Sequence, residues 1–398
     1  MTSVNADLGQ VVRTPVRRLW VAVLCGYLAL GATLQELPGY LVERFGEGPA
    51  VAGLAVGIAF AATAVVRPFA GMAGDAGRAA PMVAAGAVLT TVAALGHLLA
   101  PNVAVLLVAR LVMGAGEAAL FSAALPWVLG RTPANRRGRV AGWFGLSMWG
   151  GLALGPLVAV GAHRFGVTWW VVAALPMVST ALVASTGLRS APPRGGAGPG
   201  LRSRPRLASW RDLVPRGAGL PGLCLGMASY GYGTLTALLV LYLTGKGSGA
   251  QGVALTVFAV AFLAVRAAGS PLIDRYGGAA VARVVLGFAA AGLALLAAVP
   301  TDPAVLLGTA LAGVGVGLMF PATTAMTLQR THARAPGLAV GAMTSLWDVG
   351  VLVAGPAGGL VADHLGYRPA FALAAAVALA ALLITVRVRA VSAAVPGR

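Results

Sequence analysis

The sequence predicts an all-α integral membrane protein, with twelve transmembrane helices in two pseudo-symmetric six-helix bundles. The composition, a series of long apolar runs and an internal repeat predict this fold class. Of the 398 residues, 58% are hydrophobic and only 10% are charged, whereas soluble domains carry about 25% charged residues. A chain with so few charges cannot cover a water-exposed surface, and disordered chains are polar. The composition therefore excludes both classes.

The apolar runs give the expected helices in order. A helix needs about 20 mostly apolar residues to cross a bilayer, and it must be a helix because lipid offers backbone groups no partners. The predicted spans are 19–41, 50–74, 80–100, 103–130, 140–162, 168–188, 219–244, 250–273, 279–300, 303–328, 336–361 and 369–388. A stretch rich in Arg, Pro, Gly and Ser divides them. We predict an N-terminal bundle over 1–188, a flexible cytoplasmic linker over 189–217 and a C-terminal bundle over 218–398.

The basic residues predict the orientation. There are 29 Lys and Arg against 11 Asp and Glu, a net charge of +18 that in a soluble chain would suggest nucleic acid. In the predicted topology, however, 22 of the 29 lie in the inner loops, the termini or the adjoining span ends, and four lie on the outer side: Arg44, Arg164, Lys246 and Arg368. Basic residues concentrate on the cytoplasmic side. We therefore expect cytoplasmic termini and no nucleic-acid partner. The arginine bias is typical of a GC-rich bacterial genome, so we expect the bacterial cytoplasmic membrane.

An internal repeat relates the two sets of six spans. Arg67 and Asp75 at the end of the second span recur as Arg266 and Asp274 at the end of the eighth, in each case 199 positions later. This displacement is half the chain length. Charged residues are scarce here, so the match carries more weight than matches between glycines. Duplicated halves of this kind are common in transporters.

Four groups of residues carry chemistry, and the first is the loop after the second span, Gly71-Met72-Ala73-Gly74-Asp75-Ala76-Gly77-Arg78. Its second copy contains Asp274-Arg275-Tyr276-Gly277. The pattern resembles the G-x-x-x-D-R/K-x-G-R/K loop of the major facilitator superfamily, although the first copy is one residue short. The resemblance covers nearly the whole chain. It implies a gating loop of Gly71, Asp75, Gly77, Arg78, Asp274, Arg275 and Gly277 that joins the two halves at the cytoplasmic face. The alternative is a basic turn without a gating role.

The second group lies in the fourth span, where Arg110 and Glu117 flank Gly114 and Gly116. This order resembles the family pattern R-x-x-x-G-x-G, whose arginine is linked to proton coupling. Seven residues are almost two helical turns, about 10 Å, so the two side chains share a face but cannot pair. Each needs another partner or water. A purely structural buried network is the alternative.

The third group is the acids placed within spans: Glu36, Glu117 and Asp348. An ionised carboxylate in the bilayer costs several kcal/mol unless it faces a cavity or a partner. We therefore predict that these acids take up and release protons, with Glu117 and Asp348 ranked ahead of Glu36, which lies closer to the outer surface. A permanent pair of Asp348 with Arg110 or Arg266 is the alternative.

The fourth group lies in the fifth span, where Gly142, Gly151, Gly155 and Pro156 resemble the family motif associated with antiport, G-x8-G-x3-G-P. Small residues permit close helix contact and proline bends a helix, which would suit a moving interface. Generic packing of glycines is the alternative. The motif is the best sequence argument for export over import.

Aromatic residues predict the substrate cavity: Tyr230, Tyr232, Phe320, Trp347, Trp143 and Trp149. Such rings beside acids suit an apolar or cationic ligand. Cys25 and Cys224 lie within apolar runs and predict no disulfide, and the histidines near span ends receive no role. No Cys/His cluster has metal-ligand spacing, and no nucleotide motif is present, so we expect neither a metal nor a cofactor beyond the proton gradient.

Together these observations predict a monomeric secondary transporter and not an enzyme. The predicted activity is proton-coupled efflux of a small, mostly apolar compound such as a drug or natural product, which would give multidrug resistance, by alternating access. A proton symporter that imports a sugar or other metabolite is the first alternative. A membrane sensor or scaffold that keeps the fold without transport is the alternative from another class.

Overall fold

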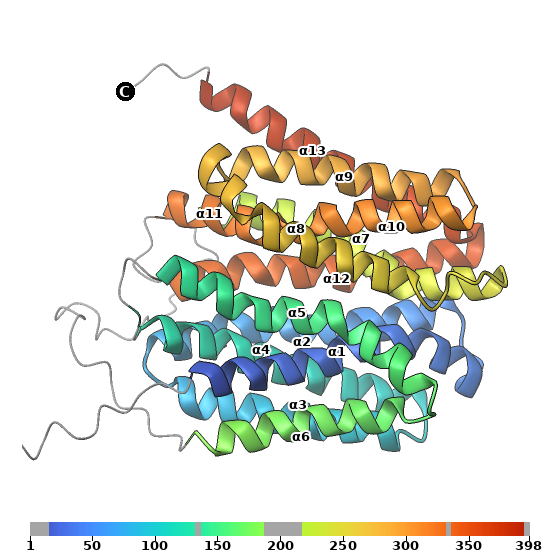
Figure 1. The fold of residues 1–398 in the computed structure, drawn as a ribbon, viewed down its shortest axis with the longest axis horizontal. Coiled ribbons are helices and arrows are strands. Elements are labelled where there is room, and N and C mark those ends of the chain that lie inside the picture. The colour runs from blue at the N-terminus through green and yellow to red at the C-terminus, as the bar shows by residue number, and fades with distance from the viewer. Residues whose placement is uncertain (1–15, 131, 133–136, 187–216, 332–335, 394–398) are drawn as a thin grey trace, which may run out of the picture.

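The computed structural model describes residues 16–130, 132, 137–186, 217–331 and 336–393. Within these ranges the chain forms helices and no strands (Figure 1). The helices are α1 (Val16–Phe45), α2 (Pro49–Asp75), α3 (Ala79–Leu99), α4 (Val103–Leu129), α5 (Arg137–His163), α6 (Thr168–Ala184), α7 (Gly219–Gly245), α8 (Ala254–Tyr276), α9 (Gly278–Ala298), α10 (Asp302–Gly317), α11 (Met319–Thr331), α12 (Pro336–Leu365) and α13 (Tyr367–Ala393). The predicted all-α fold class is confirmed.

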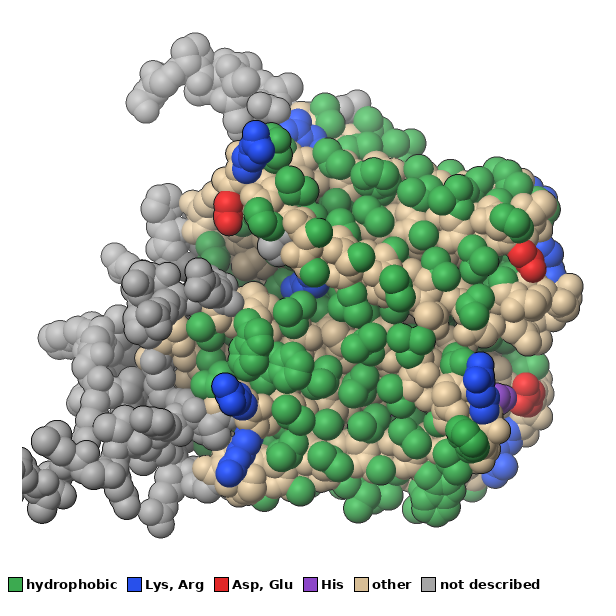
Figure 2. All heavy atoms as spheres, viewed as in Figure 1, with side chains coloured by type: hydrophobic (Ala, Val, Ile, Leu, Met, Phe, Trp, Pro, Cys, Tyr) green, Lys and Arg blue, Asp and Glu red, His purple; other side chains and the backbone are tan. Residues whose placement is uncertain are grey.

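The described helices account for all twelve predicted membrane spans. Ten stretches are long and apolar enough to cross a bilayer, and the shorter apolar helices Thr168–Ala184 and Ala254–Gly269 supply the other two. Apolar side chains cover much of the face shown in Figure 2, between the two ends of the molecule where charged side chains gather. This distribution is the one that a lipid-exposed surface requires.

The predicted tenth span is one stretch in sequence but two helices in the structure. The α-helix is interrupted at Leu318, so that α10 ends at Gly317 and α11 begins at Met319. Gly313, Gly315 and Gly317 precede the break, and glycine weakens a helix interior. The first half has Gly114 and Gly116 at matching positions but Ala118 in place of the third glycine, and α4 runs unbroken.

The internal repeat extends to the helix boundaries. The first residues of α3, α4, α5 and α6 are 79, 103, 137 and 168, and those of α9, α10, α12 and α13 are 278, 302, 336 and 367. Each pair is 199 positions apart, the displacement that relates Arg67 to Arg266. A residue in one half can therefore be compared directly with its counterpart in the other.

The helices form two groups, and α1, α2 and α5 of the first face α7, α8 and α12 of the second. In Figure 1, α1–α6 lie in the lower part of the view and α7–α13 in the upper part. Across the boundary, α2 packs against α12 and α5 packs against α8. We call these contacts the α2–α12 seam and the α5–α8 seam. The repeat interchanges the two seams, because α8 is the counterpart of α2 and α12 is the counterpart of α5.

Glycines bring the backbones of α2 and α12 into contact. A Cβ atom at Gly53 would overlap the Gly355 carbonyl, and one at Gly57 would lie 2.8 Å from the Leu352 carbonyl oxygen. Near the start of α2, a Cβ at Gly359 would lie 2.5 Å from the Pro49 carbonyl oxygen. The α2–α12 seam is thus a close backbone contact, whereas aromatic side chains separate α5 from α8.

Candidate functional site

An ion pair joins the two halves inside the α2–α12 seam. Arg67 of α2 donates from Nε to Asp348 Oδ2 of α12 at 2.6 Å, and from Nη2 to Oδ1 at 3.3 Å. Both residues are buried. The two-pronged geometry is the strong form of an arginine–carboxylate contact. The sequence analysis predicted Asp348 as a site residue and considered Arg110 or Arg266 as its partner. The structure pairs Asp348 with Arg67 instead.

The α5–α8 seam has an arginine at the matching position and an aromatic ring in place of the acid. Arg266 is the counterpart of Arg67, and Trp149 is the counterpart of Asp348. The guanidinium carbon of Arg266 lies 5.6 Å from the centre of the Trp149 ring, a cation–π contact. The two seams therefore share a cation and differ in what faces it.

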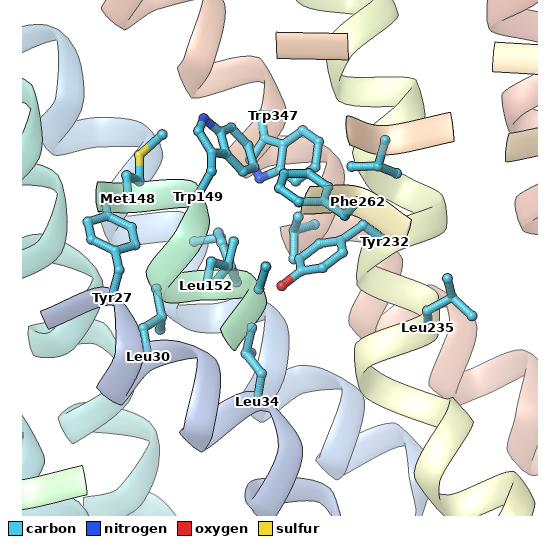
Figure 3. Close-up of a cluster of buried hydrophobic side chains, with 14 of the residues drawn as sticks. Tyr27, Leu30, Leu34, Met148, Trp149, Leu152, Tyr232, Leu235, Phe262 and Trp347 are labelled. Carbon is cyan, nitrogen blue, oxygen red and sulfur yellow. The ribbon is translucent and has the colours of Figure 1, made fainter. Parts of the chain in front are cut away.

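Aromatic rings fill the centre of the molecule between the halves. The Trp149 ring centre lies 4.9 Å from that of Trp347 and 5.3 Å from that of Phe320. Tyr232 lies 5.5 Å from Trp347, on the side opposite Trp149, and its hydroxyl points toward α5 (Figure 3). Four of the predicted cavity residues, Tyr232, Phe320, Trp347 and Trp149, thus form one cluster.

Two clefts open on this cluster. The aromatic cleft holds about 360 Å³ of empty space, its mouth included, between Trp149, Tyr232, Phe262 and Trp347. The charged cleft holds about 320 Å³ on the α1–α6 side, and its lining includes Tyr27, Arg67, Glu117, Trp149 and Trp347. Because Trp149 and Trp347 line both clefts, an occupant of one acts directly on the walls of the other.

Glu117 is the most unusual member of the charged cleft. Its side chain is fully buried, and neither carboxyl oxygen has a hydrogen-bond partner. A Cβ atom at Gly26 of α1 would lie 2.8 Å from Glu117 Oε1, so the carboxyl group rests against the α1 backbone. The Tyr27 hydroxyl donates to the Glu117 main-chain carbonyl at 3.3 Å, not to its carboxyl group.

Arg110, almost two turns of α4 before Glu117, is held by the backbone of α2. Its Nε and Nη2 donate to the carbonyl oxygens of Ala55 and Val56 at 2.9 and 3.1 Å. The sequence predicted that Arg110 and Glu117 do not pair with each other and that each needs a different partner or water. The structure supplies one for Arg110 and leaves the Glu117 carboxyl group without one.

Glu36, the third predicted acid, lies away from both clefts. Its Oε1 atom is 3.0 Å from Nδ1 of His163, an exposed residue at the end of α5. The charged cleft does not include it. The structure therefore places Glu36 near the surface, as its lower rank anticipated.

The predicted gating-loop residues lie at the ends of α2 and α8, at the predicted inner end. Gly77 and Gly277 have φ angles of 76° and 80°, a region that favours glycine, and each follows a helix end. Arg78, Asp274 and Arg275 are exposed, Gly71 is buried, and the side chain of Asp75 lies outside the described residues. Within the described ranges, no ion pair joins these loops across the halves.

A contact between the halves does occur at the opposite, predicted outer end. Asp363 near the end of α12 accepts a hydrogen bond from the backbone N–H of Ala50, at 3.1 Å. Ala50 is the second residue of α2, where N–H groups lack partners within the helix. Asp363 lies just outside the predicted span 336–361, so the sequence assigns it no role. Its placement opposite a helix start in the other half cannot be read from spacing alone.

The glycines of the antiport-type motif pack within one half. A Cβ atom at Gly155 would overlap Gly31 of α1, and one at Gly151 would lie 2.7 Å from Tyr27 Cβ. Gly142 has no atom within 4 Å of such a Cβ, and Pro156 lines the aromatic cleft. Gly151 and Gly155 therefore do not lie at the interface between the halves, where the motif was expected, because α1 and α5 belong to the same half.

Two predicted cavity residues lie elsewhere than expected, and one histidine is buried. Trp143 is 41% exposed and stacks on Trp20, with ring centres 5.4 Å apart. Tyr230 is buried but lines neither cleft. His97, a histidine near a span end that received no role, is fully buried and stacks on Trp169. The helix register turns these side chains away from the centre or, for His97, into the packed core.

Two membrane-embedded halves around a buried centre of charged and aromatic side chains define a secondary transporter, not an enzyme. The chain belongs to the Major Facilitator Superfamily, whose family model matches residues 19–277 and 222–398. An uncharacterized MFS-type transporter of Salmonella typhimurium is 32% identical over 372 residues, which cover 91% of this chain and 93% of that protein. Another from Pseudomonas aeruginosa is 33% identical over 388 residues, with coverage of 91% and 90%.

Solved structures agree with this assignment at the level of the fold. The crystal structure of the nucleoside transporter NupG matches with a TM-score of 0.68 and covers 94% of this chain, while 98% of its own chain is matched. The sequence identity is 12%. The comparison therefore supports the arrangement of the helices and carries no information on the substrate.

Proposed function

We propose that this transporter exports a small, mostly apolar compound in exchange for protons that move inward. The observation that carries the proposal is the fully buried carboxyl group of Glu117, without a hydrogen-bond partner, in the same cleft as Arg67. An unpaired carboxylate buried away from water is costly. Burial at this place therefore favours the neutral acid, and Glu117 holds a proton in this conformation.

The proton can move between two acids that share one arginine. In the conformation described, Arg67 pairs with Asp348 across the α2–α12 seam. Transfer of the Glu117 proton to Asp348 would leave a carboxylate on Glu117 and a neutral acid on Asp348. Arg67 would then be attracted to Glu117, within its own half. The number of protons and the total charge are unchanged by this transfer, but the ion pair between the halves is lost.

This exchange couples the proton to the opening of the seam. Breaking a buried ion pair is strongly unfavourable unless the arginine gains another carboxylate. The seam therefore opens when Asp348 carries the proton and closes when Glu117 carries it. Trp347 directly precedes Asp348 in the chain and lines both clefts. A substrate in the aromatic cleft would therefore contact a residue that moves when Asp348 changes its partner.

Export is supported by the motif in the fifth span and by the apolar lining of the aromatic cleft. A proton symporter that imports a sugar or other metabolite is the second candidate. It is favoured by the packing of Gly151 and Gly155 against α1, inside one half, because this removes the motif from the interface between the halves. A sensor or scaffold with the same fold would use the same switch without moving a substrate.

Everted membrane vesicles separate these candidates. A growth-protection screen of lipophilic compounds and natural products first selects a compound. Added outside vesicles with an acid interior, that compound collapses the proton gradient if the protein is an antiporter. A symporter does not collapse the gradient under these conditions, and a sensor or scaffold gives no compound-dependent proton flux.

Variants test the assignment of the acids in the same vesicles. Glu117→Gln and Asp348→Asn are each expected to abolish the response, while Glu43→Gln, at an exposed position of α1, leaves it unchanged. If the double variant Glu117→Gln/Asp348→Asn still collapses the gradient, the proposed proton carriers are wrong.

A further inference from the structure

We propose that the aromatic cleft binds an uncharged substrate with a planar aromatic ring system and an oxygen that accepts a hydrogen bond from the indole N–H of Trp149. The proposal rests on the transport function proposed above and names its substrate class. The sequence suited either an apolar or a cationic ligand, and the cleft disfavours the cation. The charge of the lining, the arrangement of the rings and one buried donor support this assignment.

None of the described residues that line the aromatic cleft is charged. Apart from hydroxyl groups and indole nitrogens, the side chains of the lining are apolar. The charged groups of the proton pathway line the other cleft instead, where Arg67 and Glu117 are found. An ion that moves from water into an apolar site is strongly disfavoured unless a partner of opposite charge compensates it. The aromatic cleft therefore selects against cations and anions alike.

Arg266 is a buried cation near this cleft, but it is not among the residues that line it. Its guanidinium carbon lies 5.6 Å from the ring centre of Trp149 and 5.9 Å from that of Phe262. Both of these rings line the cleft. An occupant of the cleft thus contacts the rings, and we assign Arg266 no contact with the substrate.

The arrangement of the rings favours a flat occupant. The Tyr232 ring centre lies 5.5 Å from those of Phe258 and Trp347, with the ring planes inclined by 41° and 36°. Trp149 stands nearly perpendicular to Trp347, at 89°. Rings from α5, α7, α8 and α12 thus surround the cleft in several orientations (Figure 3). Because offset and edge-to-face contacts between rings stabilise beyond the area that they bury, a planar ring system gains more here than a saturated one.

Trp149 also carries a hydrogen-bond donor without an acceptor. The residue is 3% exposed, and its Nε1 has no hydrogen-bond partner. An indole nitrogen can only donate a hydrogen bond. A buried donor without an acceptor is destabilising, so a ligand oxygen that accepts this bond recovers the cost. The Thr236 hydroxyl, by contrast, already donates to main-chain carbonyls of its own helix.

An uncharged substrate makes the exchange with protons electrogenic. In the proposed mechanism the proton is carried by Glu117 and Asp348, and each proton that moves inward carries one positive charge. An uncharged compound that moves outward carries none, so each cycle moves net charge inward. Exchange of one proton for a monovalent cation would move no net charge. The membrane potential, which acts on every charge that crosses the bilayer, therefore drives export of an uncharged substrate together with the pH gradient.

Four ligands with one ring system test the proposal: 2-acetylnaphthalene, its hydrocarbon isostere 2-isopropenylnaphthalene, 2-naphthoate and 2-naphthylmethylammonium. Their binding to the purified full-length protein is measured by calorimetry, with empty detergent micelles as the blank. We expect the ketone to bind about tenfold or more tightly than either ion, because neither ion finds a partner of opposite charge in the lining. Binding of either ion as tightly as the ketone, or no binding of the ketone, overturns the proposal.

Matched tryptophan variants test the hydrogen bond. Trp149→Phe keeps a ring but loses the N–H donor, and should weaken binding of the ketone about fivefold with little effect on the hydrocarbon. Trp143→Phe is the control, because Trp143 stacks on Trp20 and does not line the cleft. An unchanged ratio of ketone to hydrocarbon affinity in Trp149→Phe contradicts the hydrogen bond. Thermal unfolding shows whether this variant folds, and if it does not, the ranking of the ketone against the two ions decides, since it needs no variant.

Charge movement separates the substrate class from the proposed coupling. Proteoliposomes with equal pH on both sides receive the ketone while current is recorded on a solid-supported membrane. We expect a current that the double variant Glu117→Gln/Asp348→Asn abolishes. Binding of the ketone without current overturns the coupling and leaves the substrate class intact. Proton flux driven by the ammonium compound in preference to the ketone overturns the substrate class and leaves the coupling intact.

Discussion

Buried charged side chains in this protein differ in what stabilises them. Arg67 faces a carboxylate, Arg110 faces two main-chain carbonyls, and Arg266 faces aromatic rings. Glu117 alone among the described buried charged residues has carboxyl oxygens without a hydrogen-bond partner. Polar residues inside a membrane are costly and mark functional sites. Glu117 has no hydrogen-bond partner for its carboxyl oxygens, and the carboxylate that pairs with Arg67 belongs to the other half. The proposed exchange of partners therefore involves these two residues.

The energy of the Arg67–Asp348 pair can be measured by a double-mutant cycle. Arg67→Gln or Asp348→Asn alone is expected to destabilise the fold by about 3–5 kcal/mol, because each leaves an uncompensated buried charge. The double variant should be less destabilised than the sum of the two. Unfolding of the protein in detergent micelles with increasing SDS provides the measurement. Additive effects would contradict a direct interaction.

For single residues, the sequence predicted which acids belong to the site, but not which side chains they contact. Asp348 stands out because acids are rare in the chain, and Glu117 does so for the same reason. Arg67 marks the repeat, yet its pairing with Asp348 joins residues 281 positions apart. Which faces of two distant helices meet depends on their rotation and shift against each other. Neither quantity is encoded by spacing within one helix.

Glycines act differently from helix to helix, although they are alike in sequence. Those of α2 and α12 bring the two halves together, and Gly151 and Gly155 of α5 bring α5 against α1 in the same half. Gly142 has open space where a Cβ would lie. The same motif therefore contains glycines that the packing requires and one that it does not.

Alanine substitutions in α5 test this distinction. Gly155→Ala is expected to destabilise the protein by about 1–3 kcal/mol, the usual cost of excess volume in a packed core, because its Cβ would overlap the α1 backbone. Gly142→Ala should be neutral or slightly stabilising, since alanine favours helices. Thermal unfolding of both variants gives the comparison. Equal stability of the two would show that α1 and α5 are not as close as described.

Capping of α2 by Asp363 gives a second prediction for a single element. Asp363→Ala removes the acceptor for the Ala50 N–H and is expected to cost about 0.5–2 kcal/mol in the closed state of the predicted outer end. A change of about 1 kcal/mol alters the ratio of two states about fivefold. Pulsed EPR between spin labels at Phe165→Cys and Lys246→Cys, both at this end, should show more of the longer distance. An unchanged distribution would contradict the role of Asp363.

The number and order of the helices follow from the apolar runs, because membrane helices have a minimum length that composition reveals. The break at Leu318 does not follow. It depends on how a third glycine, Gly317, fits against Phe262 and Val265 of α8, and this is a property of tertiary packing. The helix starts at matching positions in the two halves were foreseeable from the repeat, whereas the difference between α4 and α10–α11 was not.

For the whole molecule, the distribution of arginine predicts the orientation in the membrane, and cysteine labelling tests it. A membrane-impermeant thiol reagent applied to intact cells should label Lys246→Cys and not Arg78→Cys. Everted vesicles should show the reverse. Cys25 and Cys224 are buried, so the unsubstituted protein provides a low background. Labelling of Arg78→Cys in intact cells would reverse the predicted topology.

The unequal seams also bear on how the chain arose. A half-length ancestor that paired as a symmetric dimer would have carried every contact twice, either as two ion pairs or as two arginines over rings. Only after fusion into one gene could position 348 hold aspartate while position 149 held tryptophan. After duplication, one copy of the arginine could keep an ion pair while the other changed its partner. Arg67 pairs with a carboxylate and Arg266 contacts aromatic rings, a difference that a symmetric homodimer cannot evolve.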